Sequence, residues 1–348
     1  SAASDVYKRQ TLYRTQPKPE VCKKVLKTML QDLKGGLLTN IGVGESAQYN
    51  SADASLWFFW ALQEYVEFTN SVKESWEYFK SEINHILDKY REGTLYNIHM
   101  KENGLLYGGQ KDIALTWMDA VVNGVPVTPR AGFTVELNAL WYNAICFSLE
   151  MAKKANDEKF IAKWRDIPSS LKISFRKMFW NEEKGYLADA CDNKFKDWSF
   201  RPNQIFATAL KYSMCDQKMS ESILQKVKNK LLTIKGLRTL SREDEKYIPF
   251  YQGNQKTRDY SYHQGIVWPW LLGHFAQGYV NVFKDNALPL LEEIYSKFSS
   301  DLHFYGVGSI GEIYDAEPPF KSKGTISQAW SVSELIRIKA LINNLKKN

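Results

Sequence analysis

The sequence lacks long apolar runs and has few cysteines and histidines. No apolar run reaches about 18 residues, the length that a membrane-spanning helix requires. The four cysteines are far apart and form no C-x-x-C or Cys–His pattern, so neither a zinc site nor a disulfide framework is indicated. We expect reduced, mostly structural thiols, as in a cytoplasmic protein, and no metal or other cofactor. The cysteines are Cys22, Cys146, Cys191 and Cys215.

The sequence also lacks a dense basic segment, a βαβ alternation and a short internal repeat. Its formal net charge is +7 at pH 7, but lysines and arginines are spread over helix faces without interleaved aromatics. This distribution argues against a nucleic-acid partner. No phosphate-binding glycine loop and no nucleophilic serine motif is present. The absence of a repeat of about 34–45 residues disfavours an open α-solenoid.

Aromatic residues are the clearest excess, with 11 Trp, 19 Tyr and 18 Phe. Many stand beside Asp, Glu, Asn or Gln. In carbohydrate sites, aromatic rings stack on the C–H faces of sugars, while amides and carboxylates bind hydroxyl groups. Core filling in a large helical protein explains part of this excess. The rest favours a carbohydrate-binding cleft.

The first ten residues differ in character from the rest of the chain. The segment Asp5-Val-Tyr-Lys-Arg-Gln10 is typical of a translated sequencing-library end rather than of a protein. We interpret residues 1–10 as non-native sequence. We expect residues 11–348 to form one catalytic domain that is truncated at its N-terminus.

Helical periodicity dominates the chain and predicts ten helices, with no convincing strand repeat. Short and long connections alternate between them. The helices are expected at about 20–33, 53–68, 72–90, 134–155, 157–178, 202–212, 218–232, 265–283, 286–298 and 325–345. The long connections, rich in Gly, Pro and aromatics, are 35–52, 93–132, 179–201, 233–264 and 300–324.

The alternation of short and long connections predicts the architecture. In an antiparallel helical array, alternate connections lie at the same end, so the long connections are expected on one face. Long connections in compact domains are usually functional. We predict an all-α fold, an (α/α)6 toroid of helix hairpins with its site at one rim. Ten helices, with an unpaired helix at each end, predict a twelve-helix ring that lacks its first two helices.

Two long connections carry candidate reacting carboxylates. Asp119 lies in Leu115-Thr-Trp-Met-Asp-Ala120, where an indole and apolar neighbours would raise a carboxyl pKa, as a general acid requires. Glu312 lies in a glycine-rich turn that a ligand can approach closely. The alternatives are a turn or N-cap aspartate and a solvated loop glutamate. Together the two residues match the acid and base of glycoside hydrolysis.

Polar and aromatic residues of sugar-contact type recur where helices follow the long connections. Asp53 is equally compatible with an N-cap. Asn138 and Trp141 share a helix face, which indicates either a site lining or a buried network. A lone histidine such as His263 is more often structural than catalytic. The candidate substrate-binding residues are Asn50, Asp53, Trp117, Arg130, Glu136, Asn138, Trp141, Asn203, Gln204, His263, Gln264, Trp268, Gln328 and Trp330.

Several segments resemble the C-terminal family of glycogen debranching enzymes. The resemblance preserves order and covers nearly everything from about residue 20 to 345. It implies an (α/α)6 toroid and amylo-α-1,6-glucosidase activity, which hydrolyses the single α-1,6-linked glucose of a trimmed glycogen branch with inversion. The segments are YNSADASLWF (49–58), TWMDA (116–120), TPR (128–130), VELNALWYN (135–143), RPNQIFA (201–207), GLRTLS (236–241), YHQGIVWPWLLGHF (262–275) and GSIGEIYD…GTISQAWSVSELIR (308–337).

Carried over by motif, the resemblance implies that Asp119 is the general acid and Glu312 the general base. Its implied partner is an α-glucan such as glycogen or limit dextrin, with no membrane partner. Two features depart from the family pattern: the WGRD segment that begins the family's domain is absent, and no 4-α-glucanotransferase domain is recognisable. The alternatives are another toroid glycosidase (an α-glucosidase, glucoamylase or trehalase) and a non-catalytic glucan-binding fragment.

Overall fold

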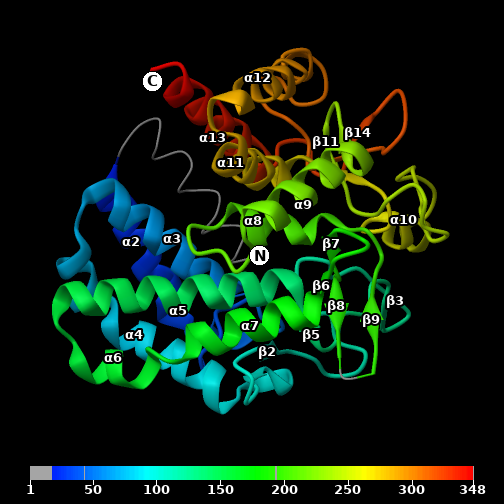
Figure 1. The fold of residues 1–348 in the computed structure, drawn as a ribbon. Coiled ribbons are helices and arrows are strands. Elements are labelled where there is room, and N and C mark those ends of the chain that lie inside the picture. Colours follow the sequence, from blue (N-terminus) through cyan, green and yellow to red (C-terminus); the bar gives the residue numbers. More distant parts are fainter. Residues whose placement is uncertain (1–17, 43, 193, 348) are drawn as a thin grey trace.

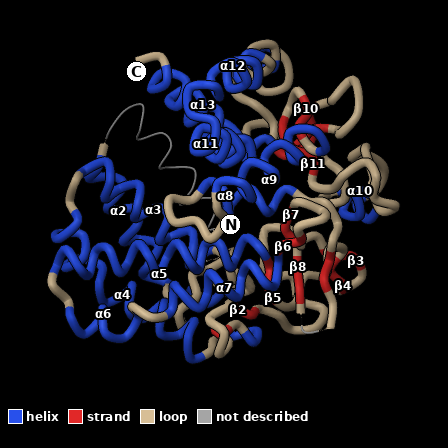
Figure 2. The backbone as a smooth tube through the Cα atoms, viewed as in Figure 1, coloured by secondary structure: helices blue, strands red, loops and turns tan. Residues whose placement is uncertain are grey.

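The structure, a computed structural model, describes residues 18–42, 44–192 and 194–347 and is predominantly helical (Figures 1 and 2). One series of helices packs side by side, each on the next, and we call it the inner series. The first of these, α3, is apolar around most of its circumference, as expected of a helix enclosed by others. The inner series comprises α3 (Ala54–Thr69), α5 (Val135–Ala155), α8 (Phe206–Ala209), α11 (Leu272–Phe283) and α13 (Ala329–Leu345).

A second set of helices covers the outside of the inner series. These helices are amphipathic: in α4 the buried residues Trp76, Phe79, Ile83 and Ile86 recur every three or four positions and face α5. In the same way α2 packs on α3, α9 on α11 and α12 on α13. The outer helices are α2 (Pro19–Met29), α4 (Val72–Glu92), α6 (Glu158–Trp164), α7 (Ile167–Phe179), α9 (Gln217–Lys230) and α12 (Leu288–Ser296).

The short connections have the turn chemistry expected of tight helix hairpins. Asn70 ends α3 and Asn156 ends α5, both in the left-handed conformation that Asn tolerates. Asp157 and Asp216 then begin α6 and α9, because their side chains accept hydrogen bonds from free backbone N–H groups of the first turn. The predicted connections near residues 70, 156 and 215 are confirmed.

The long connections contain short strands, so the expectation of a chain without strands is wrong. The connections contain two-stranded hairpins, which are β1–β2, β3–β4 and β6–β7. The strands are β1 (His99–Met100), β2 (Leu106–Tyr107), β3 (Val121–Val122), β4 (Val125–Pro126), β5 (Phe133–Thr134), β6 (Trp180–Asn181), β7 (Tyr186–Leu187), β8 (Ala190–Cys191), β9 (Lys196–Asp197), β10 (Leu232–Thr233), β11 (Gly236–Arg238), β12 (Val267–Trp268), β13 (Ile313–Tyr314) and β14 (Ser322–Lys323).

The largest of these sheets joins distant parts of the sequence. It is five-stranded and antiparallel, in the order β10-β11-β12-β13-β14. Leu237 of β11 pairs with Trp268 of β12, and Val267 of β12 pairs with Tyr314 of β13. The sheet therefore attaches the connection that carries Glu312 to the segment that precedes α11.

Several predicted helix ends are corrected by the structure. The helix expected at 265–283 begins only at Leu272, because Val267–Trp268 forms β12 and Pro269 starts a short 3-10 turn. The helix expected at 157–178 is divided into α6 and α7, with Pro168 in the first turn of α7. An additional helix, α10 (Gln255–Ser261), lies inside a predicted long connection. None of the described helices combines the length and apolarity needed to cross a membrane.

An aromatic cluster lies at the N-terminal ends of the inner helices. The Trp57 ring of α3 contacts Phe206 of α8 at 5.3 Å and Trp270 at 6.4 Å between ring centroids. Trp330 of α13 stacks on Trp270 at 5.1 Å with an interplanar angle of 10°. These rings link helices that are far apart in sequence, and they support the site described next.

Candidate active site

The long connections meet one another at the N-terminal ends of the inner helices. Each of the five is joined to another by at least one hydrogen bond. Regions that are remote in sequence, such as the loops carrying Asp119 and Glu312, therefore share one site. The joining pairs include Ala52–Leu115, Arg130–Asp189, Gln264–Thr128 and Tyr262–Glu312.

Asp119 stands just before the β3–β4 hairpin, which is closed by Asn123 and Gly124 at positive φ, as in the preferred two-residue hairpin turns. Asp119 is exposed to solvent, although many protein atoms lie around its carboxyl group. Burial raises the pKa of Asp119 to about 6, and the charges of Asp53 and Glu312 raise it further against an opposing backbone hydrogen bond. Asp119 and Glu312 are thus close enough to interact electrostatically.

Glu312 is half-buried and held at both carboxylate oxygens. The Tyr262 hydroxyl donates to Oε1 at 2.8 Å, and the backbone N–H of Thr325 donates to Oε2 at 2.9 Å. Gly324, at φ +68°, leaves room for this arrangement, because a Cβ there would lie 2.4 Å from Oε2. The alternative of a freely solvated loop glutamate does not fit this orientation.

Asp53 occupies the N-cap position of α3, but its side chain makes no capping hydrogen bond. Instead its Oδ1 accepts from the Ser51 hydroxyl at 2.5 Å, and Ser51 Oγ accepts from the N–H of Ala54. Burial raises the pKa of Asp53 against hydrogen bonds from Ser51 and Trp57. Asn50, half-buried, accepts at Oδ1 from the Asn40 amide at 3.3 Å.

Two half-buried indoles belong to the same segments: Trp117 lies two residues before Asp119, and Trp330 follows the connection that carries Glu312. The Trp117 ring meets Trp270 edge to face at 5.1 Å, and Trp330 stacks on the same ring. Trp117 Nε1 donates to Asn203 Oδ1 at 2.8 Å, which fixes the ring orientation. Partly exposed, rigid indoles of this kind suit the apolar faces of sugar rings.

A buried polar network lies beneath Trp117. Arg130 donates to both carboxylate oxygens of Glu136 and, through Nε, to Asp189 Oδ2 at 2.7 Å. Asn203 Nδ2 donates to Asp189 Oδ1 at 2.7 Å, which connects the ion pairs to Trp117. Arg201 Nη2 donates to Gln264 Oε1 at 2.9 Å, and Gln264 donates to Thr128. We call this set the buried polar network: Thr128, Arg130, Glu136, Asp189, Arg201, Asn203 and Gln264.

The structure places Arg130, Glu136, Asn203 and Gln264, all expected to line the site, within this network. All four are at most 8% exposed and direct their polar groups to one another or to the backbone. They hold the surrounding connections in place. Asp189 lies at the centre of the network, but the sequence did not indicate it. Nothing in its sequence context distinguishes a carboxylate in a buried network from one in a solvated loop.

Other expected lining residues also have internal roles. Asn138 is fully buried and bonds the backbone N–H and C=O of Leu106 at 2.8 and 3.1 Å. Trp141 is fully buried, packs on Tyr90 and Trp164, and donates from Nε1 to the backbone oxygen of Gly104 at 3.2 Å. Gln204 bonds backbone groups of Leu187 and Arg201. Of the two alternatives for Asn138 and Trp141, the buried one is therefore correct.

His263 and Trp268 form the aromatic support behind Trp117. The His263 ring is fully buried and stacks on Trp268 at 5.5 Å. Burial, together with the charges of Arg201 and Arg130, lowers the pKa of His263 to about 3, so the ring is neutral at neutral pH. Trp268 Nε1 donates to the backbone oxygen of Tyr262 at 3.0 Å. Gln328 accepts from the N–H of Ala329 and so caps α13.

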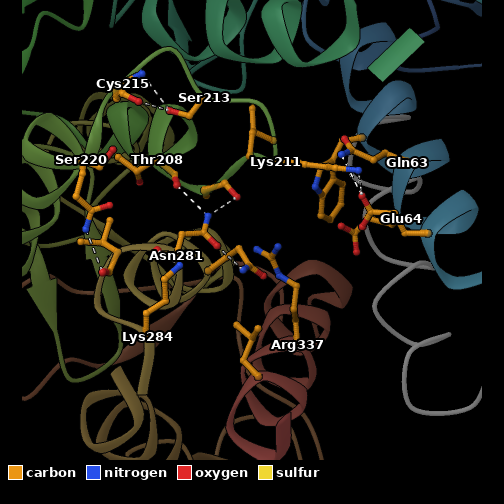
Figure 3. A pocket seen from close by; sticks show the side chains of 18 of the residues that line it. Gln63, Glu64, Thr208, Lys211, Ser213, Cys215, Ser220, Asn281, Lys284 and Arg337 are labelled. Carbon is orange, nitrogen blue, oxygen red and sulfur yellow. Dashed lines mark hydrogen bonds and ion pairs between the residues drawn. The ribbon is translucent and has the colours of Figure 1, made fainter. Parts of the chain in front are cut away.

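A polar cavity of about 670 Å³ lies at the other ends of the inner helices (Figure 3). Residues such as Gln63, Lys211, Asn281 and Arg337 line it, from α3, the α8–α9 connection, α11 and α13. It is remote from Asp119 and Glu312, so we do not assign the chemistry to it. Among the described residues, no cluster of three or more His, Cys, Asp or Glu side chains could hold a metal ion.

Comparison with known proteins identifies related sequences. The sequence pattern described as Amylo-alpha-1,6-glucosidase matches residues 15–337. The glycogen debranching enzyme of Saccharomyces cerevisiae is 22% identical over an alignment of 341 positions, and the match covers 71% of this chain. The match spans 22% of the length of the yeast protein. The chain belongs to the amylo-alpha-1,6-glucosidase family of glycoside hydrolases.

Proposed function

We propose that this chain is the catalytic part of an inverting hydrolase that releases glucose from α-1,6-glucosyl branch stubs of glycogen-like glucans. The observation that carries the proposal is the pairing of Asp119, with its pKa raised to about 6, and Glu312, which is oriented at both oxygens. A raised pKa suits a general acid, and a fixed carboxylate suits a general base. Membership of the family and the match to the yeast debranching enzyme support the substrate class.

In this mechanism, protonated Asp119 donates its proton to the glycosidic oxygen as the C1–O bond breaks. Ionised Glu312 accepts a proton from a water molecule, whose oxygen bonds C1 from the opposite face, so the configuration at C1 inverts. Afterwards Asp119 is ionised and Glu312 protonated, and exchange with solvent restores both. Trp117 and Trp330 offer ring faces to the sugars, while Asp53 lies close enough to influence the charge of Asp119.

We infer that the helices form an (α/α)6 toroid. The inner and outer sets and their hairpin connections support this arrangement. In the described part of the chain, α3 packs on α5 and α13 packs on α11, and between α3 and α13 lies the polar cavity of Figure 3.

A substrate panel tests the function. Purified protein is incubated with a maltooligosaccharide carrying one α-1,6-glucosyl stub, with maltotriose and with trehalose, and the released glucose is followed by proton NMR. We expect hydrolysis of the stub substrate and initial release of β-glucose. Preference for maltotriose or trehalose would indicate another toroid glycosidase. Binding of limit dextrin without hydrolysis would indicate a glucan-binding module.

A further inference from the structure

Tyr262 contacts the candidate base Glu312 directly. It is not among the site residues that the sequence indicated. It follows directly after α10, the helix that periodicity did not predict. Its ring is fixed by Tyr251 at 5.6 Å, His263 at 4.8 Å and Trp268 at 4.8 Å between centroids. A phenol enclosed by three rings has little rotational freedom, so its hydroxyl has a defined position.

The Tyr262 hydroxyl acts as a hydrogen-bond donor to Glu312. Burial first, and then the nearby charges of Glu312 and Asp119, raise the pKa of Tyr262 far above its ordinary value. The phenol therefore keeps its proton at neutral pH. An ionised carboxylate has only acceptors, so the 2.8 Å contact is a donation from Tyr262 Oη to Glu312 Oε1.

This donor restricts how the Glu312 carboxylate can turn. The terminal torsion of a glutamate has a broad energy profile, so a single hydrogen bond fixes it poorly. Thr325 N–H holds Oε2 and Tyr262 holds Oε1, which together define the carboxylate plane. Each oxygen keeps a second lone pair, so one remains available to accept a proton from water.

Helix α10 also connects the two candidate catalytic carboxyl groups. It packs on β3, the strand that begins two residues after Asp119, and its last turn leads into Tyr262. Among the described residues, the groups that act electrostatically with Glu312 include Asp119, Tyr251 and Tyr262. Of these, Tyr262 donates a hydrogen bond to it.

We propose that Tyr262 is a positioning residue that orients the base Glu312 for attack by water. This assignment rests on the proposed function, since it gives Tyr262 a task in the same reaction. Tyr262 itself neither accepts nor donates the transferred proton. Its contribution is the fixed hydrogen bond to Oε1.

The test compares Tyr262→Phe with Tyr251→Phe. The second variant removes a phenol hydroxyl from the adjoining ring and serves as the matched control. Proteins carrying carboxyl-¹³C glutamate are titrated by NMR, with the Glu312 signal assigned through Glu312→Gln. We expect Glu312 to take up its proton at higher pH in Tyr262→Phe than in the wild type or in Tyr251→Phe, because the charged form loses a donor.

Kinetics give the second readout. On the stub substrate we expect Tyr262→Phe to lower kcat about tenfold at little change in KM, because the lost interaction acts in the reaction rather than in binding. The acidic limb of its pH–rate profile moves to higher pH, which a purely structural role would not cause. An unchanged titration and unchanged kcat would overturn the inference.

The two proposals fail in distinguishable ways. A wild-type protein without hydrolysis, but with the titration shift in Tyr262→Phe, rejects the proposed function and retains the effect of Tyr262 on Glu312. Hydrolysis with no titration shift rejects the inference alone. If Tyr262→Phe does not fold, 3-fluorotyrosine at position 262 replaces it. Its more acidic phenol donates more strongly, so Glu312 must then titrate at lower pH, and an unchanged titration again rejects the inference.

Discussion

Trp117 Nε1 donates a hydrogen bond to Asn203 Oδ1 across 2.8 Å, so a half-buried indole of the site is held by a fully buried amide. The same amide donates to Asp189 Oδ1 at 2.7 Å. Asn203 is thus the link between the buried polar network and the ring that faces the site. The orientation of Trp117 depends on a residue that no substrate can reach.

We predict that Asn203→Ala lowers the free energy of unfolding by about 1–3 kcal/mol, because it leaves a buried indole N–H and a carboxylate oxygen without their partner. KM for the glucan rises because the Trp117 ring loses its fixed orientation. Urea unfolding followed by tryptophan fluorescence measures the first effect, and initial rates measure the second. Asn286→Ala, in an exposed turn, is the control. Equal stability of both variants would contradict the assigned link.

Asp119→Asn is predicted to lower kcat on the stub substrate by about 10²–10⁴-fold, the usual contribution of general acid catalysis. Hydrolysis of α-glucosyl fluoride should be affected much less, because fluoride leaves without needing a full proton transfer. The control is Asp112→Asn, an exposed aspartate of the same connection with φ 64°, a conformation that Asn accepts. Equal losses on both substrates would exclude Asp119 as the acid.

The raised pKa of Asp119 also predicts a pH-dependent stability. The folded value is about 6, above the value of about 3.9 for an unfolded chain, so the folded state binds more protons between these limits. The free energy of unfolding therefore falls as pH rises from about 4 to about 6, and above that range it falls no further on account of Asp119. Because solvent reaches the side chain, screening keeps the effect below about 1 kcal/mol.

Asp119→Asn removes this dependence. The variant should unfold at higher urea concentration than the wild type at pH 7.5, and the difference should become smaller at pH 3.5. Unfolding curves at the two pH values check the prediction. A difference that does not change with pH would show that the effect of the substitution is unrelated to ionisation.

Glu312→Gln is predicted to abolish detectable glucose release while the protein stays folded, because a neutral amide cannot accept a proton from water. With α-glucosyl fluoride as substrate, added azide should restore turnover and form β-glucosyl azide, since azide needs no deprotonation. The control is Glu317→Gln, in the same connection, whose carboxylate pairs with Arg242. Formation of the α-azide, or no rescue with retained binding, would argue against Glu312 as the base.

Arg130→Met is predicted to cost about 3–5 kcal/mol of stability, because Glu136 and Asp189 would stay buried without their shared cation. The double variant Arg130→Met, Glu136→Gln should recover part of this loss, since one uncompensated charge is removed. Urea unfolding of the single and double variants gives the coupling energy. If the losses in the free energy of unfolding were strictly additive, Arg130 and Glu136 would act independently.

The helices were predictable because a helix that is buried on one side has apolar residues at every third or fourth position of the sequence. The buried positions of α4 recur every three or four residues, and Asn70 and Asn156 mark helix ends. The strands were not predictable, since two residues such as Val267 and Trp268 are too short to show alternation. Helix α10 is mostly exposed and polar, so it has no apolar period to detect.

The candidate site was only partly predictable for a related reason. The sequence indicated Asp119 and Glu312 through their apolar, aromatic and glycine neighbours, and the structure brings their connections together. It did not separate residues that face the site from those beneath it, because Arg130 or Asn203 would have the same residue type in either place. The role proposed for Tyr262 could be inferred only from its tertiary contact with Glu312.

The pairing of β12 with β13 has a consequence for motion. Glu312 directly precedes β13, and β13 is held between β12 and β14. A segment paired on both sides cannot open as an independent lid without breaking the ladder that runs back to β10. We therefore expect the amide protons of β12 and β13 to exchange with solvent among the slowest in the chain. Access for the proposed substrate then depends on the other long connections, while the segment that carries Glu312 remains fixed.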